Sequence, residues 1–297
     1  MGPSTPSGLQ QPVRSRRRVV RRAGLFVIVA FAASWTPLAI LLATTGDHTA
    51  GAGSMALFLA GGTGPMLAAV VAAAALDGRR GLRMLLTGIR RWRVGRWYLL
   101  LVAPLPVALL AMLLAVLLGP ASADPAGIGH WLLLPAYLVS GVLVGGLEEI
   151  GWRGYLQPVL QGRWSAAAVS LAIGLIWALW HAPLFWLAST TQAETSTVAF
   201  VVQAVALSVI FAWAYNATAG SALLAILLHG AINGWYSLVV QGIAPAAAAE
   251  FAVGTATITV VLALVLLARY GPTDLAGCSR IAWTESSASP DTGGPRG

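Results

Sequence analysis

Apolar segments long enough to cross a lipid bilayer recur along the chain, and they limit its fold more than any other feature of the sequence. Seven or eight such segments lie between Ala23 and Ala268, separated by short polar loops. A transmembrane helix requires about 20 mostly apolar residues, and inside lipid its backbone hydrogen bonds must be satisfied within the segment. We therefore predict an all-α, polytopic membrane bundle of about eight transmembrane helices.

The composition supports one membrane domain with two polar ends. Hydrophobic residues make up 58% of the chain and charged residues 9%, which excludes an ordinary soluble domain. Residues 1–22 and 269–297 are rich in Pro, Ser and Gly, as disordered segments are. We predict a basic disordered cytoplasmic arm over 1–22, a transmembrane domain over 23–268 and a disordered cytoplasmic tail over 269–297.

The basic residues predict the orientation of the bundle. All 18 are arginines, and they fall in the arm, in residues 77–96, in residues 153–163 and in the tail. The loops assigned to the other side contain no arginine or lysine and carry Asp47, Asp124, Glu194 and Glu250. Because cytoplasmic loops are enriched in arginine and lysine, we predict a multi-pass plasma-membrane protein with both termini in the cytoplasm.

The net charge of +8 has the same explanation. The arginines flank apolar spans, where they contact anionic lipid, so we predict the lipid bilayer and no nucleic acid as a partner. The complete use of arginine in place of lysine suggests a GC-rich genome and a bacterial source.

Ionisable side chains inside the predicted spans are the candidates for function. Such a group costs about 2.5 to 3.5 kcal/mol on insertion scales, so it is rare and by default suggests a functional site. The first set is Glu148-Glu149-Ile-Gly-Trp-Arg153. Glu149 and Arg153 are four residues apart and can form an ion pair on one helix face, whereas Glu148 points about 100° away from Glu149. A helix-stabilising ion pair with a second interfacial carboxylate is the alternative interpretation.

Three further polar residues lie in later spans. His181 is an imidazole among tryptophans, and His229 and Asn233 are four residues apart, so their side chains share one helix face. The alternative interpretation is that His181 is a packed, hydrogen-bonded residue and that His229 and Asn233 join neighbouring helices. Glu148, His181, His229 and Asn233 are the predicted catalytic residues, and Glu149 and Arg153 the predicted supporting ones.

Taken in order, these motifs resemble those of the CPBP family, the CAAX prenyl proteases and bacteriocin-processing (ABI) proteins. The family pattern is Glu-Glu-x-x-x-Arg, then Phe-x-x-x-His, then His-x-x-x-Asn or Asp. The resemblance covers about residues 130–240, and Trp177 stands where the family usually has Phe.

The resemblance implies an intramembrane endopeptidase. It implies that Glu148 and His181 activate a water for attack on a peptide carbonyl, and that His229 and Asn233 hold the oxyanion. We expect a polar intramembrane cavity that opens to the cytoplasmic side, and a membrane-associated or prenylated protein or peptide as substrate. CAAX proteases remove the C-terminal tripeptide from prenylated proteins, but no feature of this sequence reads a prenyl group.

A metal-dependent mechanism stays open at this point. Glu148, His181 and His229 supply one oxygen and two nitrogens, a set that can bind zinc with water in the fourth position, as in a metalloprotease. No His-Glu-x-x-His motif supports zinc, so we favour a glutamate-dependent hydrolase that requires no cofactor.

Two other functions also stay open. A non-catalytic immunity or scaffolding protein of the same fold is the first, and the presence of every polar position of the family pattern disfavours it. A proton-coupled transporter that uses the buried carboxylates is the second. The sequence shows no internal repeat of the kind that many transporters have, and this disfavours the transporter.

Overall fold

The computed structural model describes residues 16–118, 127–243 and 247–283, and these residues are mostly helical. The α-helices are α1 (Arg16–Thr44), α2 (Ala52–Gly62), α3 (Gly64–Ile89), α4 (Pro104–Leu118), α5 (Leu134–Val144), α6 (Glu149–Gly151), α7 (Gln157–Gln161), α8 (Ala166–Trp180), α9 (Thr197–Ala217), α10 (Ala222–Val240) and α11 (Ala248–Tyr270). Short 3₁₀ or π turns are η1 (Gly95–Leu101), η2 (Gly127–Leu133), η3 (Gly146–Glu148), η4 (Trp152–Leu156) and η5 (Ala182–Trp186).

The helices confirm the predicted fold class. Within the described ranges, seven helical stretches are long and apolar enough to cross a membrane, and the pair α2 and α3, bent by 46°, can add an eighth. The stretch from His130 to Gln161 counts as one of the seven and contains η2, α5, η3, α6, η4 and α7 in succession. The chain is therefore an all-helical polytopic bundle with the number of spans that the apolar segments predicted.

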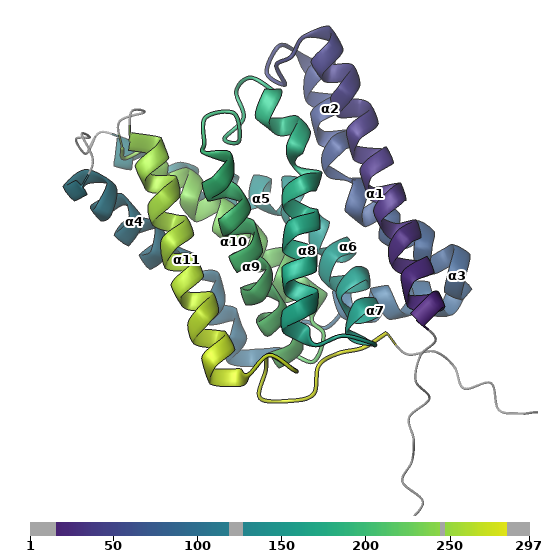
Figure 1. The fold of residues 1–297 in the computed structure, drawn as a ribbon. Helices are drawn as coiled ribbons and strands as arrows, with labels where there is room; N and C mark the ends of the chain where they lie inside the picture. The colour runs from purple at the N-terminus through teal and green to yellow at the C-terminus, as the bar shows by residue number, and fades with distance from the viewer. Residues whose placement is uncertain (1–15, 119–126, 244–246, 284–297) are drawn as a thin grey trace, which may run out of the picture.

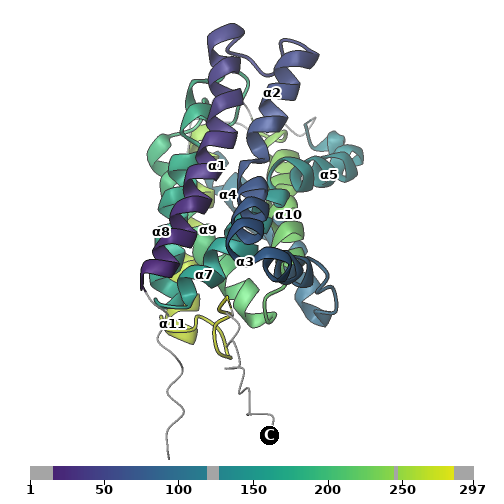
Figure 2. The same cartoon turned by 90° about the vertical axis from the view of Figure 1, so that its right-hand side faces the viewer.

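The bundle has a buried centre and two flanks. In Figure 1, α8, α9 and α10 occupy the middle, α4 and α11 lie along one edge, and α1, α2 and α3 form the other. Helix α10 packs on α5 and α4, α8 packs on α9, and α11 packs on α9 and α4. Figure 2 shows α5 beside α10 on the face that α2 and α3 flank. The outer faces expose leucine and valine, for example Leu175, Leu179 and Val265, as expected of helices that contact lipid.

Serine residues begin the three central helices. Ser165, Ser196 and Ser221 precede α8, α9 and α10, and each side chain accepts a hydrogen bond from the backbone N–H three residues later. This cap satisfies an amide that the first helical turn leaves without a partner. The local sequence therefore fixes where each helix starts, and so the depth at which its polar residues lie.

The first described helix corrects part of the predicted arm. Helix α1 already begins at Arg16, and Arg22 is 8% exposed and paired with Asp77 of α3. Residues 16–22 are therefore helical, because this ion pair lets the arginine end of α1 pack against α3; residues 1–15 lie outside the described part. Helix α3 bends at Gly78, whose φ of 59° is in the region that glycine adopts easily. Beyond this bend, residues 79–89 carry three of the seven arginines of residues 77–96.

The tail also differs from its prediction. Residues 271–283 follow the end of the bundle, where Leu275 is 0% exposed and Trp283 is 2% exposed. The backbone N–H of Trp283 donates to the carbonyl of Pro158 over 2.8 Å, and its indole N–H donates to Asp77. This segment is therefore packed rather than disordered, because its apolar side chains and its polar backbone both find partners on the helices. Residues 284–297 lie outside the described part.

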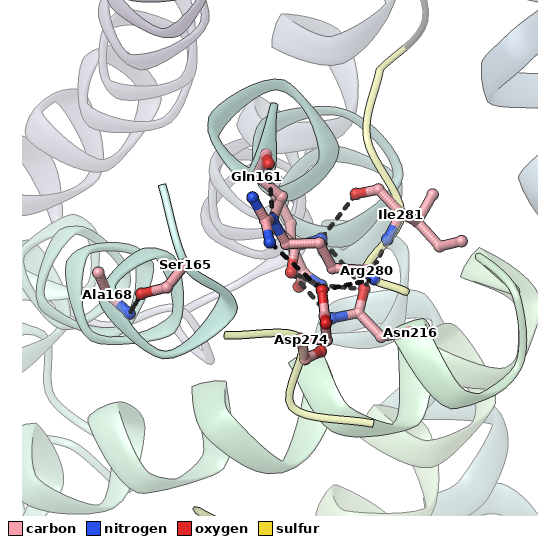
Figure 3. Close-up of polar contacts among 8 residues, drawn as sticks. Gln161, Ser165, Ala168, Asn216, Asp274, Arg280 and Ile281 are labelled. Atoms are coloured by element: carbon pink, nitrogen blue, oxygen red, sulfur yellow. Dashed lines mark hydrogen bonds and ion pairs between the residues drawn. The ribbon is translucent and has the colours of Figure 1, made fainter. Parts of the chain in front are cut away.

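A polar cluster joins this tail to the bundle, and we call it the tail cluster: Gln161, Asn216, Asp274 and Arg280. Asn216 donates to Gln161 and to the carbonyl of Asp274, both over 2.9 Å. Arg280 donates to the carbonyl of Gln161 over 2.9 Å and pairs with Asp274 over 3.2 Å. Figure 3 shows these side chains meeting between α7, α9 and the tail. The tail cluster therefore fastens the C-terminal segment to two helices.

Candidate active site

The two adjacent glutamates lie where the span from His130 to Gln161 is least regular. The helix changes from 3₁₀ at Gly146–Glu148 to α at Glu149–Gly151 and to π at Trp152–Leu156. These forms differ in the number of residues per turn, and π turns inside helices often occur at functional sites. The two carboxylates consequently meet different partners, although both are buried, Glu148 at 4% and Glu149 at 0% exposure.

Glu148 is held by two indole groups. Trp177 of α8 donates its indole N–H to Oε2 over 2.8 Å, and Trp152 donates to the same oxygen over 3.3 Å. Both bonds fall on Oε2, so Oε1 is the oxygen that can accept a proton from a bound water. A buried carboxylate with two fixed donors has one orientation, which is a requirement for a general base.

Glu149 is the centre of an ion-pair network. Its carboxylate accepts two bonds from Arg153 Nη1, over 3.0 and 2.8 Å, and lies 2.9 Å from Nδ1 of His229 on α10. Arg153 also donates to the hydroxyl of Ser208 on α9 over 3.1 Å, and its guanidinium lies 4.5 Å from the ring centre of Phe211. Three helices are therefore coupled through one buried carboxylate.

His181 follows directly after the last residue of α8. Its Nδ1 lies 2.9 Å from the carbonyl oxygen of Trp177. A carbonyl can only accept, so Nδ1 carries the proton and Nε2 of the neutral ring is an acceptor. The ring packs edge-on against Trp180, at 4.7 Å between centroids, and against Phe200 of α9 at 5.1 Å. The imidazole is therefore oriented from α8 and α9 with one nitrogen available.

His229 and Asn233 face the same point. Glu149 accepts from Nδ1 of His229, so Nε2 lies on the other side of the ring. A Cβ placed on Gly145 would lie 2.8 Å from this Nε2 and also closer than 3.0 Å to Nδ2 of Asn233. Both nitrogens thus converge beside Gly145, and only glycine leaves room for them there.

One cavity connects the four predicted catalytic residues. It has a volume of about 520 Å³, and Glu148, His181, His229 and Asn233 all line it. Glu149 and Arg153 are not among the described residues that line it, and Arg153 is 0% exposed. The structure therefore separates the six residues as the sequence analysis did, with four on the cavity wall and two behind it.

The lining of the cavity extends to one end of the bundle. We define the mouth as the lining residues His48, 189–192, 194–195, Ala248 and 251–252. Figure 1 places the turn after α1 and the segment before α9 at the end of the bundle opposite to the start of α1 and the tail. At the other end, the arginine end, Trp152, Arg153 and Tyr155 are 0% exposed and do not line the cavity. The described lining residues thus extend towards the end opposite to the arginines, and the predicted opening on the cytoplasmic side stays a prediction.

The zinc alternative requires Glu148, His181 and His229 to surround one point. Among the residues that the structure describes, no group of three or more His, Cys, Asp or Glu side chains is arranged to hold a metal ion. Nδ1 of His181 and Nδ1 of His229 are engaged by acceptors, and Oε2 of Glu148 by two indoles, so that both Nε2 atoms and Oε1 are the atoms a metal ion could bind. Glu148, His181 and His229 thus share a cavity, and the choice between the glutamate and the zinc mechanism stays a prediction.

Some contacts of the site could not be read from the sequence motifs. The sequence identified Trp177 as a departure from the family pattern, and the structure makes it a hydrogen-bond donor to Glu148, which a phenylalanine could not be. Ser208 and Gly145 belong to none of the motifs, yet Ser208 binds Arg153 and Gly145 makes room for two side chains. The bond between Glu149 and His229, 80 positions apart, joins the first motif directly to the third.

Fold and site together define a class: a polytopic helical membrane protein with a carboxylate, two imidazoles and an amide on the wall of one buried cavity. Residues 130–235 match the family model described as type II CAAX prenyl endopeptidase Rce1-like. The chain is 33% identical over 98 residues to the CAAX prenyl protease 2 of Methanococcus maripaludis, across 31% of this chain and 36% of the relative. Residues 130–235 are thus similar to the CAAX prenyl endopeptidases, the group that the three motifs resemble. The alignment spans about a third of that curated relative.

Proposed function

We propose that this chain is an intramembrane endopeptidase of the CAAX-protease type that hydrolyses a peptide bond without a metal ion. The observation that carries the proposal is the meeting of Glu148, His181, His229 and Asn233 on one cavity wall, where each of the first three binds through one side-chain atom and leaves another available. The family of the matched segment supports the reaction class.

Water activation is assigned to Glu148 and His181. A water between Oε1 of Glu148 and Nε2 of His181 transfers a proton to the carboxylate, and its oxygen forms a bond to the carbonyl carbon of the substrate. The indole bonds to Oε2 hold the carboxylate in place during this transfer. General base catalysis of this kind contributes about 10²- to 10⁴-fold to a rate.

The oxyanion is assigned to His229 and Asn233. Their side-chain nitrogens converge beside Gly145, so both can point at a single oxygen. The amide of Asn233 is a donor in every state, and Nε2 of His229 is a donor when both ring nitrogens carry protons. When the intermediate collapses, the C–N bond breaks and Glu148 returns its proton to the leaving amine. The products are a carboxylic acid and an amine, and transfer of the acid proton to the amine gives a carboxylate and an ammonium group.

Glu149 and Arg153 are assigned positioning roles. Glu149 orients the imidazole of His229 through Nδ1, and Arg153 holds Glu149 from the opposite side. Neither residue touches the cavity, so each acts through His229. For the substrate, the name of the relative supports a membrane-associated or prenylated protein or peptide.

Cleavage of quenched fluorescent peptides by the purified, detergent-solubilised protein tests the proposal. We expect wild-type protein to cleave, Glu148→Gln to lose at least about 10²-fold in rate, and a zinc chelator to change neither. Glu250→Gln is the matched control, because Glu250 is a carboxylate on α11 that does not line the cavity. Loss of activity with the chelator would support the zinc alternative instead. No cleavage of any peptide by wild type would leave the scaffolding alternative ahead.

A further inference from the structure

Helix α1 packs beside the site, although it lies outside residues 130–235, the segment that is similar to the CAAX prenyl endopeptidases. It packs on α3 and on η5. From Phe26 onward its buried residues are Phe26, Ala30, Ser34, Leu38 and Leu41. Ser34 is the polar one among them and is 0% exposed. A buried hydroxyl group normally has a hydrogen-bond partner, so the partner of Ser34 indicates what this face of α1 does.

Ser34 holds the indole of Trp180, the last residue of α8. The indole N–H of Trp180 donates to Oγ of Ser34 over 2.8 Å, between residues 146 positions apart. Gly64, at the start of α3, lies on the other side of this hydroxyl, and a Cβ placed on it would lie closer than 3.0 Å to Oγ. Trp180 itself is only 4% exposed. The hydroxyl is therefore confined between two helices, and it gives the indole one orientation.

The next residue of α1 holds the backbone of the same tryptophan. The indole N–H of Trp35 donates to the carbonyl oxygen of Trp180 over 3.0 Å. The last four carbonyl groups of an α-helix have no partner within the helix, and that of Trp180 is one of these four in α8. An indole from α1 therefore caps the C-terminus of α8. Ser34 and Trp35 together fix both the side chain and the backbone of Trp180.

Trp180 in turn fixes the position of His181. The two residues are adjacent, and their rings meet edge-on with 4.7 Å between centroids. His181 follows the last turn of α8, and helix ends fray unless other contacts hold them. Nε2 of His181 is the atom that we assign to the attacking water, and a misplacement of about 1 Å in a reacting group can lower a rate by about 10²-fold. The contacts that hold Trp180 therefore bear on the rate.

Helix α1 also touches an indole that binds Glu148. Phe26 meets Trp152 edge-on with 5.4 Å between ring centroids, and Trp152 donates to Oε2 of Glu148 over 3.3 Å. Trp180 meets the same indole from α8, with 6.1 Å between centroids. Helix α1 thus packs behind both residues to which we assign water activation.

We infer that Ser34 and Trp35 are positioning residues for His181, so that α1 is part of the active site. The inference rests on the proposed peptidase function and adds to it two residues that none of the three motifs contains. Neither residue is among the described residues that line the cavity. Each therefore acts through Trp180 and does not touch the substrate.

The kinetics of Ser34→Ala test this role. The substitution removes the acceptor of the Trp180 indole, so we expect kcat and kcat/KM to fall together by about tenfold. Trp35→Phe removes the donor to the carbonyl and should act in the same way; it also keeps the test open if the first variant does not fold. Ser170→Ala is the matched control, because Ser170 is a serine of α8 that is 1% exposed and donates to the carbonyl of Ala166. Equal losses in Ser34→Ala and Ser170→Ala, or wild-type kcat in both α1 variants, would overturn the inference.

A double-mutant cycle separates positioning from a general loss of stability. Trp180→Phe removes the indole N–H and keeps an aromatic ring beside His181. If Ser34 acts through this N–H, Ser34→Ala should change kcat by less than about twofold in the Trp180→Phe background, because coupled residues are not additive. The full tenfold loss in both backgrounds would show that Ser34 acts independently of Trp180, against the inference.

NMR of the histidine rings tests the same contact without requiring activity. The chain contains four histidines, so isotope labelling of their ring nitrogens in the detergent-solubilised protein gives few signals, and His181→Gln assigns one set. In Ser34→Ala we expect the signals of His181 to shift or broaden, and those of His229, which Glu149 holds over 2.9 Å, to stay. This result without cleavage by the wild-type protein would overturn the peptidase proposal but support the hold of α1 on His181. Unchanged His181 signals would overturn the inference whether or not the wild-type protein cleaves.

Discussion

Two polar clusters in this bundle differ in how completely their hydrogen bonds are used. In the tail cluster, the amide of Asn216 accepts from Gln161 and from the backbone of Ile281, and donates to Gln161 and to the carbonyl of Asp274. In the cavity cluster, Glu148, His181, His229 and Asn233, the first three each bind through one side-chain atom and direct another towards the cavity.

This difference separates a structural role from a chemical one. A polar group inside an apolar bundle is costly unless it is hydrogen-bonded. A network in which the donors and acceptors all have partners avoids this cost and makes the structure around it rigid. The tail cluster fits this description and fastens residues 272–283 to α7 and α9. The side chains of the cavity cluster have fixed orientations but keep polar atoms available for a substrate, which is the condition that catalysis requires. Burial of a polar residue in a membrane protein is therefore weaker evidence for function than incomplete use of its hydrogen bonds.

The largest effect is expected at Glu149. This residue binds His229 of the cavity cluster, and both of its own carboxylate oxygens have hydrogen-bond partners. Glu149→Gln leaves Arg153 as an unpaired buried charge, so we expect about 3 to 5 kcal/mol loss of stability together with loss of peptidase activity. Thermal unfolding in detergent measures the first and peptide cleavage the second. In the double variant with Arg153→Met, stability should recover and activity should not. Recovery of both would contradict the positioning role of Glu149.

Asn233→Ala should separate activity from stability. Removal of one oxyanion donor typically costs about 2.7 to 4 kcal/mol in the barrier, or 10²- to 10³-fold in kcat. Asn233 is half-buried on the cavity wall, so we expect the unfolding temperature to change little. Steady-state kinetics would give the split between kcat and KM, and a pure increase in KM would assign Asn233 to substrate binding instead.

Trp177→Phe tests the departure from the family pattern. Phenylalanine keeps the aromatic ring beside His181 and removes the 2.8 Å bond to Glu148. A hydrogen bond to a charged group contributes about 1.5 to 3 kcal/mol, so we expect a fall in kcat of roughly ten- to a hundredfold. Trp235→Phe is the matched control, because its indole donates to the carbonyl of Leu101 away from the cavity. Equal effects of the two substitutions would contradict the assigned role of Trp177.

The smallest effect on activity is expected in the tail cluster. Asn216→Ala leaves Gln161 and the carbonyl of Asp274 without their partner, at a cost of about 1 to 3 kcal/mol in stability. Activity per folded molecule should stay at the wild-type value, since Asn216 does not line the cavity. Thermal unfolding and active-site titration would measure the two quantities. A selective loss of activity would show that the two clusters are coupled.

The sequence determined the fold class and the main candidates for the site. Apolar segments of about 20 residues predict spanning helices because lipid leaves the backbone no other way to satisfy its hydrogen bonds. Ionisable residues within these segments are costly, so the few that occur indicated Glu148, His181 and His229 without any structure. The spacing of four predicted the pair of Glu149 with Arg153, which the structure confirms.

Only the tertiary structure decided which of these residues meet, and how far the cavity lining extends. Composition alone described residues 16–22 and 271–283 as disordered, yet the partners that order them, Asp77, Gln161 and Asn216, are distant in the sequence. The bond between Glu149 and His229, the indole of Trp177 on Glu148 and the space at Gly145 likewise depend on how helices pack. Periodicity fixes the face and the approximate depth of a residue on its own helix, whereas the contacts between helices depend on packing that no local pattern encodes.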